Sequence, residues 1–406
     1  MPALTNIAHL YTCAGDAQGE VGHVANAALV WEGSAIRWVG AEKELPAEYR
    51  KWETEDAGGR IVIPGLIDCH THLAFGGWRA GDFERRIKGE TYLQIAQAGG
   101  GIASTVAKTR ALSEEELVER ANDVLEEMVA LGVTTVEAKS GYGLTTADEL
   151  KTLRAYRTLS TSQPVRLSTT FLGAHTIPPE YKERRAEYVK LVAEEMIPAV
   201  AGEKLATFCD AFVEASAFTH DEARTVFAAA KKHGLVPKLH ADQITANGGA
   251  ELAAEVGAAS ADHLEQISDA GIAAMVKAKV VGVSLPLATL YLDMQPLPAR
   301  KMIAAGVPIA VATDFNPGSA PSWHLPLAMM LACNLQRMTP AEVLVGTTRM
   351  AAWALRRDDV GVLATGKQAD FAIIEAEDLT HWMYQFQPNA CVRTVIGGKT
   401  AWSTVG

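Results

Sequence analysis

Three polar residues spaced two apart, Asp68, His70 and His72, follow a short apolar segment of the chain. Side chains at alternate positions of a β-strand point to the same face, so this spacing places two imidazoles side by side. His240 and Asp314 each close a later apolar segment of the same kind. Three imidazoles and one carboxylate suit zinc or iron and leave room for water. The pattern therefore predicts a metal centre, although an H-x-H pair taken alone also fits a polar surface or a satisfied core pair.

Short apolar segments alternate with helical patterns from about residue 62 onward. The strand candidates are residues 62–72, 134–141, 165–175, 208–215, 236–242, 259–265, 280–286 and 308–314. Eight parallel strands with outer helices can close into a (β/α)₈ barrel, whose catalytic residues lie at the carboxyl ends of the strands. His175 and His263 also fall at such ends. An open doubly wound sheet is the alternative, but no strand candidate leads into G-x-G-x-x-G or a P-loop, so we predict an α/β fold of the TIM-barrel type.

Two of the intervening helices have explicit start signals. Ser113 precedes E-E-E, which places a glutamate three residues after a hydroxyl that can cap a helix, and apolar residues follow at helical spacing as far as Gly132. The sequence T-H-D-E at residues 219–222 is a second signal of the same kind. We therefore predict helices that begin after Ser113 and after Thr219.

The two ends of the chain differ in character from the rest. Residues 1–61 and 362–406 are rich in short β-type segments such as AALVWEGSAIRWVG and CVRTVIGGKTAWS. Neither piece is large enough to bury much surface alone, so we expect them to pair into one small β domain that brings the two termini together. Residues 62–361 then form the barrel domain.

Composition and charge narrow the classes of function. The chain has 406 residues and a formal net charge of −11. A net negative charge opposes sequence-independent binding of the nucleic-acid phosphate backbone. Its five cysteines are scattered and lack C-x-x-C spacing, which argues against a disulfide framework. The chain has neither a signal-peptide pattern at its start nor a stretch of about 18 apolar residues. We therefore expect a cytoplasmic protein that binds a small-molecule substrate and neither nucleic acid nor a membrane.

Several segments carry a resemblance to a known family. VIPGLIDCHTHLAFGG, KLHAD, SADHLE and VATDFNPGS together resemble the amidohydrolase superfamily of metal-dependent hydrolases. Within it, FGGWRAGDFERR, GGGIASTV, EAKSGYGL, FLGAHTIP and ATDFNPGSAPS are similar to the imidazolonepropionase family. The resemblance spans nearly the whole chain and implies a distorted barrel with a small flanking β-sandwich. It also implies hydrolysis of the cyclic amide of 4-imidazolone-5-propanoate to N-formimino-L-glutamate in histidine degradation.

The resemblance assigns roles to residues at the strand ends. The ligands that it implies for one zinc or iron ion are His70, His72, His240 and Asp314. Water activated by that metal would attack the ring carbonyl, which His175 would polarise. His263 and Asp314 would carry the water's proton to the departing nitrogen. The alternative for His263 is a second metal ligand, but residues 208–215 contain no lysine that could bridge two metals as it does in two-metal relatives.

A further group is implied to bind the substrate: Arg79, Tyr142, His175, Gln243, Asn316, Gly318 and Ser319. Arg79 would pair with the propanoate, because an anion in a partly dry pocket favours a fixed guanidinium. A surface salt bridge is the alternative for Arg79, and a core role is the alternative for Tyr142. The roles of Tyr92 and Lys139 stay open, since a lysine inside a barrel strand can simply form an ion pair.

Gln243 departs from one version of the family pattern, which has a glutamate as general base after H-A-D. A glutamine cannot take a proton, so either it only hydrogen-bonds the imidazolone or this chain has lost its base. We favour the first, because the other ligand positions are intact. The alternatives for the whole protein are a ring aminohydrolase of the same superfamily and, from a different class, a catalytically silent metal-binding barrel. The resemblance also suggests a homodimer and leaves the choice between zinc and iron open.

Overall fold

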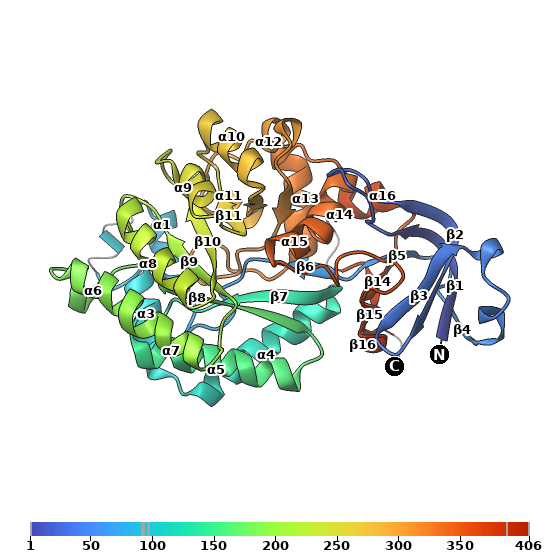
Figure 1. Ribbon diagram of the computed structural model, residues 1–406, viewed down its shortest axis with the longest axis horizontal. Coiled ribbons are helices and arrows are strands. Elements are labelled where there is room, and N and C mark those ends of the chain that lie inside the picture. Colours follow the sequence, from blue (N-terminus) through green and yellow to red (C-terminus); the bar gives the residue numbers. More distant parts are fainter. Residues whose placement is uncertain (1, 91–93, 96–97, 387–388, 405–406) are drawn as a thin grey trace.

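The fold is that of a computed structural model, which describes residues 2–90, 94–95, 98–386 and 389–404. Tyr92, one of the residues whose role the sequence leaves open, lies outside these described residues. The chain forms a barrel surrounded by helices and, beside it, a smaller sheet near which both termini lie (Figure 1).

Eight parallel strands form the barrel, in the order in which they occur along the chain. They are β6 (Leu66–Asp68), β7 (Val133–Lys139), β8 (Arg166–Ala174), β9 (Phe208–Phe212), β10 (Val236–Ala241), β11 (Ser260–His263), β12 (Val281–Ser284) and β13 (Ile309–Val311). The first and eighth strands meet through the residues that follow them. Asp314 N donates to His70 O at 3.0 Å, and His72 N donates to Phe315 O at 2.8 Å. This arrangement confirms the predicted eight-stranded barrel and brings two predicted metal-binding segments side by side.

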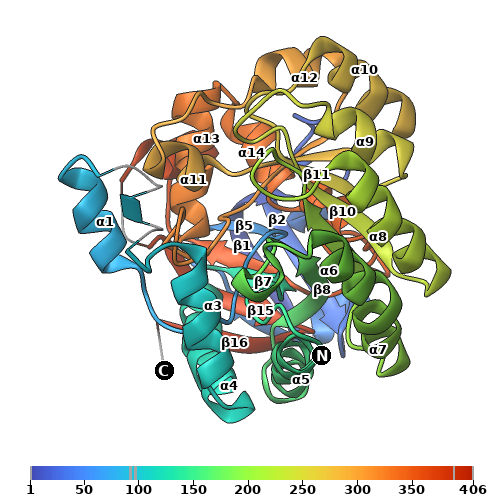
Figure 2. The same ribbon diagram turned by 90° about the vertical axis from the view of Figure 1, so that its left-hand side faces the viewer.

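Helices surround the barrel strands (Figure 2). They are α1 (Ala80–Ile87), α3 (Ile102–Ala111), α4 (Glu114–Ala130), α5 (Thr146–Ser162), α6 (Arg185–Leu191), α7 (Ile197–Gly202), α8 (His220–Lys232), α9 (Gly249–Glu255), α10 (Asp269–Ala278), α11 (Pro286–Tyr291), α12 (Ala299–Ala305), α13 (Leu325–Gln336), α14 (Pro340–Gly346), α15 (Arg349–Ala354) and α16 (Leu379–Tyr384). The side chains that face inward from the helices and outward from the strands form one continuous apolar core.

The two helices with explicit start signals begin where the sequence predicts. α4 begins after Ser113, whose hydroxyl accepts from the backbone N–H of Glu116 at 3.1 Å while the Glu116 carboxylate accepts from the N–H of Ser113 at 2.8 Å. Thr219 and Glu222 form the same reciprocal pair at the start of α8. Both pairs satisfy N–H groups that have no partner within the helix.

The second sheet joins strands from both ends of the chain, as predicted. Its members are β1 (Pro2–Tyr11), β2 (His23–Glu32), β3 (Ala35–Ala41), β4 (Glu53–Asp56), β5 (Ile61–Pro64), β14 (Phe371–Ile374), β15 (Cys391–Ile396) and β16 (Lys399–Ser403). β5 pairs with β1 on one side and with β14 on the other, so the two chain ends meet at its position in one mixed sheet. The domain division after residue 61 and before residue 362 stays a prediction; β5, which extends to Pro64, belongs to the small sheet.

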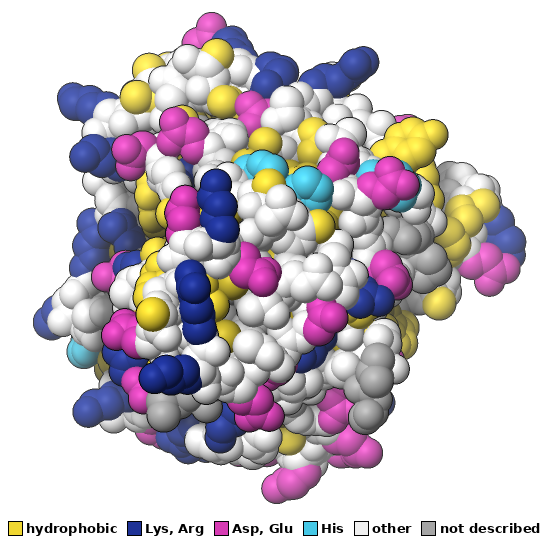
Figure 3. All heavy atoms as spheres, turned by 90° about the vertical axis from the view of Figure 1, so that its right-hand side faces the viewer, with side chains coloured by type: hydrophobic (Ala, Val, Ile, Leu, Met, Phe, Trp, Pro, Cys, Tyr) yellow, Lys and Arg dark blue, Asp and Glu magenta, His cyan; other side chains and the backbone are white. Residues whose placement is uncertain are grey.

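The surface beside the small sheet is mostly polar (Figure 3), and the cysteines are unpaired. On the face that carries the small sheet, acidic and basic side chains are interspersed and apolar atoms form small groups (Figure 3). All five cysteines lie within the described residues and are free thiols. Among the described residues, no helix has both the length and the apolar character needed to cross a membrane.

One ion pair connects the barrel to the small sheet. Arg166, the first residue of β8, donates to both carboxylate oxygens of Asp370, at 2.7 and 3.1 Å, and Asp370 is buried next to β14. Replacing Arg166 with methionine leaves this carboxylate without its cation, which costs about 2 kcal/mol. We expect Arg166→Met to lower the melting temperature by about 2 °C for a chain of this size. The control Arg157→Met removes an exposed arginine of α5 and should melt as the wild type does; an equal melting temperature for the two variants would contradict the expectation.

Candidate active site and metal centre

A cavity of about 570 Å³ opens at the carboxyl ends of the barrel strands. Its lining includes nearly all of the residues predicted for the site: His72, Arg79, Tyr142, His175, His240, Gln243, His263, Asp314, Asn316, Gly318 and Ser319. His70 is fully buried and lies against Asp314. Phe83, Arg86 and Tyr291 also line the cavity. The sequence analysis gave none of them a role, although Phe83 and Arg86 lie within the FGGWRAGDFERR segment. The barrel therefore brings the predicted residues together around one cavity.

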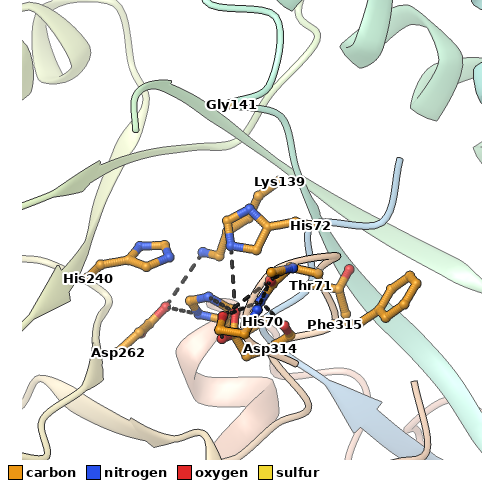
Figure 4. Close-up of polar contacts among 12 residues, drawn as sticks. His70, Thr71, His72, Lys139, Gly141, His240, Asp262, Asp314 and Phe315 are labelled. Carbon is orange, nitrogen blue, oxygen red and sulfur yellow. Dashed lines mark hydrogen bonds and ion pairs between the residues drawn. The ribbon is translucent and has the colours of Figure 1, made fainter. Parts of the chain in front are cut away.

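The predicted metal ligands lie close together (Figure 4). Oδ1 of Asp314 is 3.4 Å from Nε2 of His70 and 3.7 Å from Nε2 of His72. The ring centroid of His240 is 4.6 Å from that of His70 and 5.5 Å from that of His72. One ligand atom from each of His70, His72 and Asp314 lies within 4.8 Å of the others, and the same holds for His70, His240 and His263. The cluster thus contains the four predicted ligands together with His263, the residue for which a ligand role was the alternative.

These donors fit a divalent metal ion. Nε2 of His70 and Nε2 of His240 are buried and have no hydrogen-bond partner among the described residues. Burial, together with Lys139 and the neighbouring histidines, holds the pKa of His70 well below its usual range, and burial does the same for His72. Both rings are therefore neutral, as a metal ligand must be. A buried nitrogen lone pair without a partner is costly unless a ligand such as a metal ion occupies it.

Carboxylates from other strands orient two of these imidazoles. Nδ1 of His70 lies 2.6 Å from Oδ2 of Asp262, and Nδ1 of His240 lies 3.0 Å from Oδ2 of Asp210. A carboxylate only accepts, so Nδ1 of His70 carries the ring proton and Nε2 keeps the lone pair that can bind a metal. Nδ1 of His240 faces its carboxylate at ion-pair distance. The sequence analysis assigned no role to Asp210 or Asp262. The signal that could have found them is a charged residue within an otherwise apolar strand.

Lys139, whose role the sequence leaves open, is the last residue of β7 and is fully buried. Its ammonium nitrogen lies 3.0 Å from Oε1 of Glu137, 2.8 Å from Oδ2 of Asp210 and 3.5 Å from Oδ2 of Asp262. The structure therefore places Lys139 in an ion-pair network in the barrel interior.

His263 and Asp314 have an unusual backbone conformation. Their φ angles are 81° and 57°, in the left-handed region that residues other than glycine rarely adopt. Burial raises the pKa of Asp314 to about 6, against the opposing effect of His263. Burial alone would lower the pKa of His263, but the Glu265 carboxylate, 3.7 Å away, raises it. An imidazole and a carboxylate whose pKa values are both raised by their surroundings are suited to proton transfer at this end of the barrel.

His175 follows β8, and its ring stacks on that of His72 with 5.1 Å between centroids. Its Nδ1 lies 2.9 Å from the carbonyl oxygen of Gly141, so Nδ1 donates. Gly141 has a φ of 111°, and a Cβ there would lie 3.1 Å from Nδ1 of His175, so a side chain would disturb this contact. Burial lowers the pKa of His175 to about 3. The neutral ring therefore offers Nε2 as an acceptor, and the carbonyl-polarising role that the resemblance implies for His175 stays a prediction.

Tyr142 lies in the loop that follows β7, with its ring centroid 5.2 Å from that of His175. Burial raises the pKa of Tyr142, so its phenol keeps the proton and can donate a hydrogen bond. The buried carboxylate of Glu149 in α5 holds this loop by accepting from the backbone N–H groups of Gly141, Gly143 and Leu144, at 2.8 to 3.1 Å. The sequence analysis did not identify Glu149, whose anchoring role depends on a turn between two elements.

Arg79 immediately precedes α1, and its guanidinium lies against Gly318. A Cβ at Gly318 would come within 2.3 Å of Nη2 of Arg79, so a side chain there would make the guanidinium shift from this position. Nε of Arg79 lies 3.5 Å from Oδ2 of Asp82, an oxygen that also accepts from the backbone N–H of Gly101 at 2.8 Å. Because Arg79 lines the cavity and its contact with Asp82 is long, the guanidinium is positioned to pair with an anion there.

The loop after β13 is held by its own hydrogen bonds. Oδ1 of Asn316 accepts from the backbone N–H groups of Gly318 and Ser319, both at 2.8 Å, and its Nδ2 donates to the carbonyl of Asp314 at 2.6 Å. Oγ of Ser319 lies 3.4 Å from Oδ2 of Asp314. Asn316, Gly318 and Ser319 line the cavity as expected, but the backbone donors expected to meet the substrate are used within this loop. Direct contact of these three residues with substrate stays a prediction.

Gln243 lines the cavity from the loop between β10 and α9. Two buried carboxylates, from Asp242 and Glu214, fix this loop. Asp242 accepts from the backbone N–H groups of Asn247, Gly248, Gly249 and Ala250 at 2.8 to 3.1 Å. Glu214 accepts from those of Ile244 and Thr245, both at 3.1 Å. The aspartate of the H-A-D segment therefore positions Gln243 rather than facing the metal ligands.

Comparison with known proteins agrees with this geometry. The model of the amidohydrolase family matches residues 61–401. The imidazolonepropionase of Shouchella clausii is 45% identical over 390 residues, which cover 95% of this chain and 87% of that protein. The imidazolonepropionase of Myxococcus xanthus is 50% identical over 352 residues, which cover 86% of this chain and 84% of that one.

Solved structures are similar in fold at much lower identity. Atrazine chlorohydrolase from Arthrobacter aurescens, complexed with zinc, superimposes with a TM-score of 0.76 at 18% identity, over 100% of this chain and 97% of that chain. The 5-methylcytosine deaminase from Klebsiella pneumoniae, with 5-fluorocytosine, superimposes with a TM-score of 0.75 at 16% identity, over 100% and 98% of the two chains.

Proposed function

This chain belongs to the amidohydrolase family and within it to the imidazolonepropionases, and from that premise we infer that it hydrolyses 4-imidazolone-5-propanoate to N-formimino-L-glutamate. Water adds to the ring carbonyl, the C–N bond of the cyclic amide breaks, and a proton passes to the departing nitrogen. The product carries a new carboxylate and a formimino group. The observation that carries this inference is a single cavity that contains both a metal-binding histidine cluster and the guanidinium of Arg79.

We propose that one zinc or iron ion is held by His70, His72, His240 and Asp314. Their proximity and the unpartnered Nε2 atoms of His70 and His240 support this set. When bound, such an ion lowers the pKa of water toward neutrality and stabilises negative charge on a carbonyl oxygen. His263 is paired through Nδ1 with Glu265 and is assigned to proton transfer rather than to the metal.

Asp314 and His263 are the groups proposed to move the proton. Oδ1 of Asp314 faces the two histidines that follow β6, so it is placed to accept a proton from water held there. The raised pKa of Asp314, about 6, makes the protonated form accessible near neutral pH. His263, on the adjoining side of the cavity, then donates to the departing nitrogen. Proton transfer by positioned groups of this kind contributes about 10² to 10⁴ in rate.

We propose that His175 orients the imidazolone ring by accepting a hydrogen bond from a ring N–H. The proton on Nδ1 is bound to Gly141 O, so Nε2 is the free nitrogen of the neutral ring. This proposal differs from the carbonyl-polarising role that the resemblance implies. Tyr142, whose phenol stays protonated, is the neighbouring group that can donate to the substrate.

The test of the proposed function is the loss of 4-imidazolone-5-propanoate, followed by ultraviolet absorbance, with the product identified as formiminoglutamate. A chelated sample is run alongside. We expect rapid loss with metal-loaded protein and little loss after chelation. Release of ammonia from ring amines, without turnover of the imidazolone, would favour a ring aminohydrolase instead. A metal-loaded protein without either activity would favour the silent barrel.

Gln243 is expected to bind the substrate and not to act as a base. Gln243→Ala removes one hydrogen bond to the ring, so KM should rise about tenfold while kcat changes by less than about threefold. Steady-state kinetics on the imidazolone measure both constants. Gln243→Glu is the matched variant, and it should leave kcat near that of the wild type if Asp314 already takes the proton. A selective collapse of kcat in Gln243→Ala with KM unchanged would contradict this role.

Two further expectations rest on the sequence alone. The resemblance supports a homodimer, which light scattering would detect as twice the mass of the chain. The scattered free cysteines support a reducing compartment such as the cytoplasm.

A further inference from the structure

Beneath the candidate metal ligands, the interior of the barrel is ionic rather than apolar. Lys139 comes from β7, Asp210 from β9 and Asp262 from β11, three alternate strands, and all three side chains are fully buried. Side chains from alternate strands form the layers that fill such a barrel, and branched apolar residues normally dominate them. Burying these charges is costly and does not favour stability by itself. A buried charged layer of this kind therefore indicates a role other than stabilising the fold.

The contacts of Lys139 link two histidine-orienting carboxylates. Its Nζ lies 2.8 Å from Oδ2 of Asp210, and the same oxygen lies 3.0 Å from Nδ1 of His240. Its Nζ also lies 3.5 Å from Oδ2 of Asp262, and that oxygen lies 2.6 Å from Nδ1 of His70. The other oxygen of each carboxylate has no hydrogen-bond partner among the described residues. One ammonium group thus lies against the same oxygens that face the two imidazoles. Figure 4 shows the half of this arrangement that runs from Lys139 through Asp262 to His70.

We propose that Lys139 is a positioning residue that fixes His70 and His240 relative to each other through Asp262 and Asp210, and so prepares the metal site before a metal binds. The inference rests on the proposed metal centre and adds to it a residue that touches neither metal nor substrate. His70 and His240 come from strands that are not neighbours in the sheet, so no backbone hydrogen bond between β6 and β10 sets their spacing. The Lys139 bridge supplies that link through side chains.

Charge and tautomer give the physical reason. With Lys139 in place, Oδ2 of Asp262 and Oδ2 of Asp210 each lie between the ammonium and Nδ1 of one imidazole, which leaves Nε2 of each ring facing the cluster. Without the ammonium, the two buried carboxylates would lose their shared cation, and each could turn away from its imidazole. The rings of His70 and His240 would then no longer be held at a fixed spacing from each other. Partners of this kind change metal affinity by about 10-fold to 100-fold when they are removed.

Lys238 provides a matched control for the loss of a buried lysine. It is also fully buried and also pairs with Glu137, at 2.7 Å. Its Nζ additionally donates to the carbonyl of Cys69 at 3.2 Å and lies only at 4.0 Å from Asp262. Lys238→Met therefore removes the same charge from the same interior as Lys139→Met does. Unlike Lys139, Lys238 does not connect the two histidine-orienting carboxylates.

The test measures metal binding rather than turnover. Wild type, Lys139→Met and Lys238→Met are stripped of metal, and the Kd for Zn²⁺ is measured by competition with a chromophoric chelator. The visible spectrum of the Co²⁺-loaded proteins reports the ligand arrangement. We expect Lys139→Met to weaken binding by about 10-fold to 100-fold and to change the Co²⁺ spectrum, and Lys238→Met to stay within about threefold of wild type with its spectrum preserved. Equal effects of the two variants, or unchanged affinity in Lys139→Met, would overturn the inference.

Isosteric variants keep the proposal testable if Lys139→Met does not fold. Asp210→Asn and Asp262→Asn retain side-chain size and remove the charge that Lys139 contacts. Each should weaken Zn²⁺ binding by at least about tenfold, and unchanged affinity in both would overturn the inference. If the wild type binds Zn²⁺ and both variants bind it equally well, the role of Lys139 is refuted but the proposed metal centre is not. A wild-type protein that binds no Zn²⁺ would refute the proposed metal centre itself.

Discussion

Replacing Asp314 with asparagine is expected to lower kcat/KM for the imidazolone by about 10⁴-fold, the larger of the two main effects predicted for this protein. The carboxylate is assigned two roles, as a metal ligand beside His70 and His72 and as the group that takes the proton of water. An amide of the same size can do neither well, because it has no negative charge and cannot accept the proton. Initial rates from the ultraviolet assay measure the loss.

Metal content separates the two roles of Asp314. If the variant loses its metal by elemental analysis, the ligand role dominates, and if it retains metal but not activity, the proton role dominates. Asp221→Asn, which changes an aspartate in the first turn of α8, serves as the control and should turn over at the wild-type rate. Activity of Asp314→Asn within tenfold of wild type would contradict both roles.

The second large effect is expected at Arg79. Arg79→Met removes the guanidinium that is proposed to pair with the propanoate, and the expected result is a fall of about 100-fold in kcat/KM, mostly through KM. A charge-assisted pair in a partly dry cavity contributes about 2 to 3 kcal/mol, which corresponds to that factor. Because the propanoate does not react, the loss should fall on binding more than on kcat.

A substrate analogue makes this prediction specific. A derivative with a neutral propanamide in place of the propanoate should be a poor substrate of the wild type, and Arg79→Met should cause little further loss with it. Arg86→Met is the matched control, since Arg86 lines the same cavity but has its guanidinium carbon 4.3 Å from the ring centroid of Tyr291. Its effect should stay below about tenfold. Equal losses of kcat/KM in the two arginine variants, or unchanged turnover in Arg79→Met, would contradict the assignment of Arg79 to the propanoate.

Much of the fold follows from local patterns. The capping residues Ser113 and Thr219 lie within three residues of the glutamates that complete each cap, so neighbours along the chain decide where α4 and α8 begin. The eight strand segments are apolar and short, and their alternation with helices leaves few topologies. The pairing of the two chain ends was predicted because neither end alone could bury enough surface. The position of β5 was harder to foresee, since the sequence runs without a break from it into β6.

The proposed metal and substrate residues were accessible from the sequence because the metal ligands stand at strand ends and all of these residues belong to, or directly follow, a recognisable motif. The sequence could not show how His175 would be protonated, since that depends on the carbonyl of Gly141, which reaches it only in the folded chain. Asp210 and Asp262 were missed, and the role of Lys139 was left open, for a related reason. Each is isolated within its own strand, and only the register of separate strands brings the three together.

The sequence by itself therefore determined the class of fold, the family and the set of groups with chemical capacity, because periodicity, capping and motif spacing act over a few residues. Only the tertiary structure decided which nitrogen of each imidazole is free, which carboxylates hold loops and which hold histidines, and how Arg79 lies over Gly318. These features depend on barrel closure, which sets distances between residues far apart in the chain to within a hydrogen bond. No short segment of sequence encodes those distances on its own.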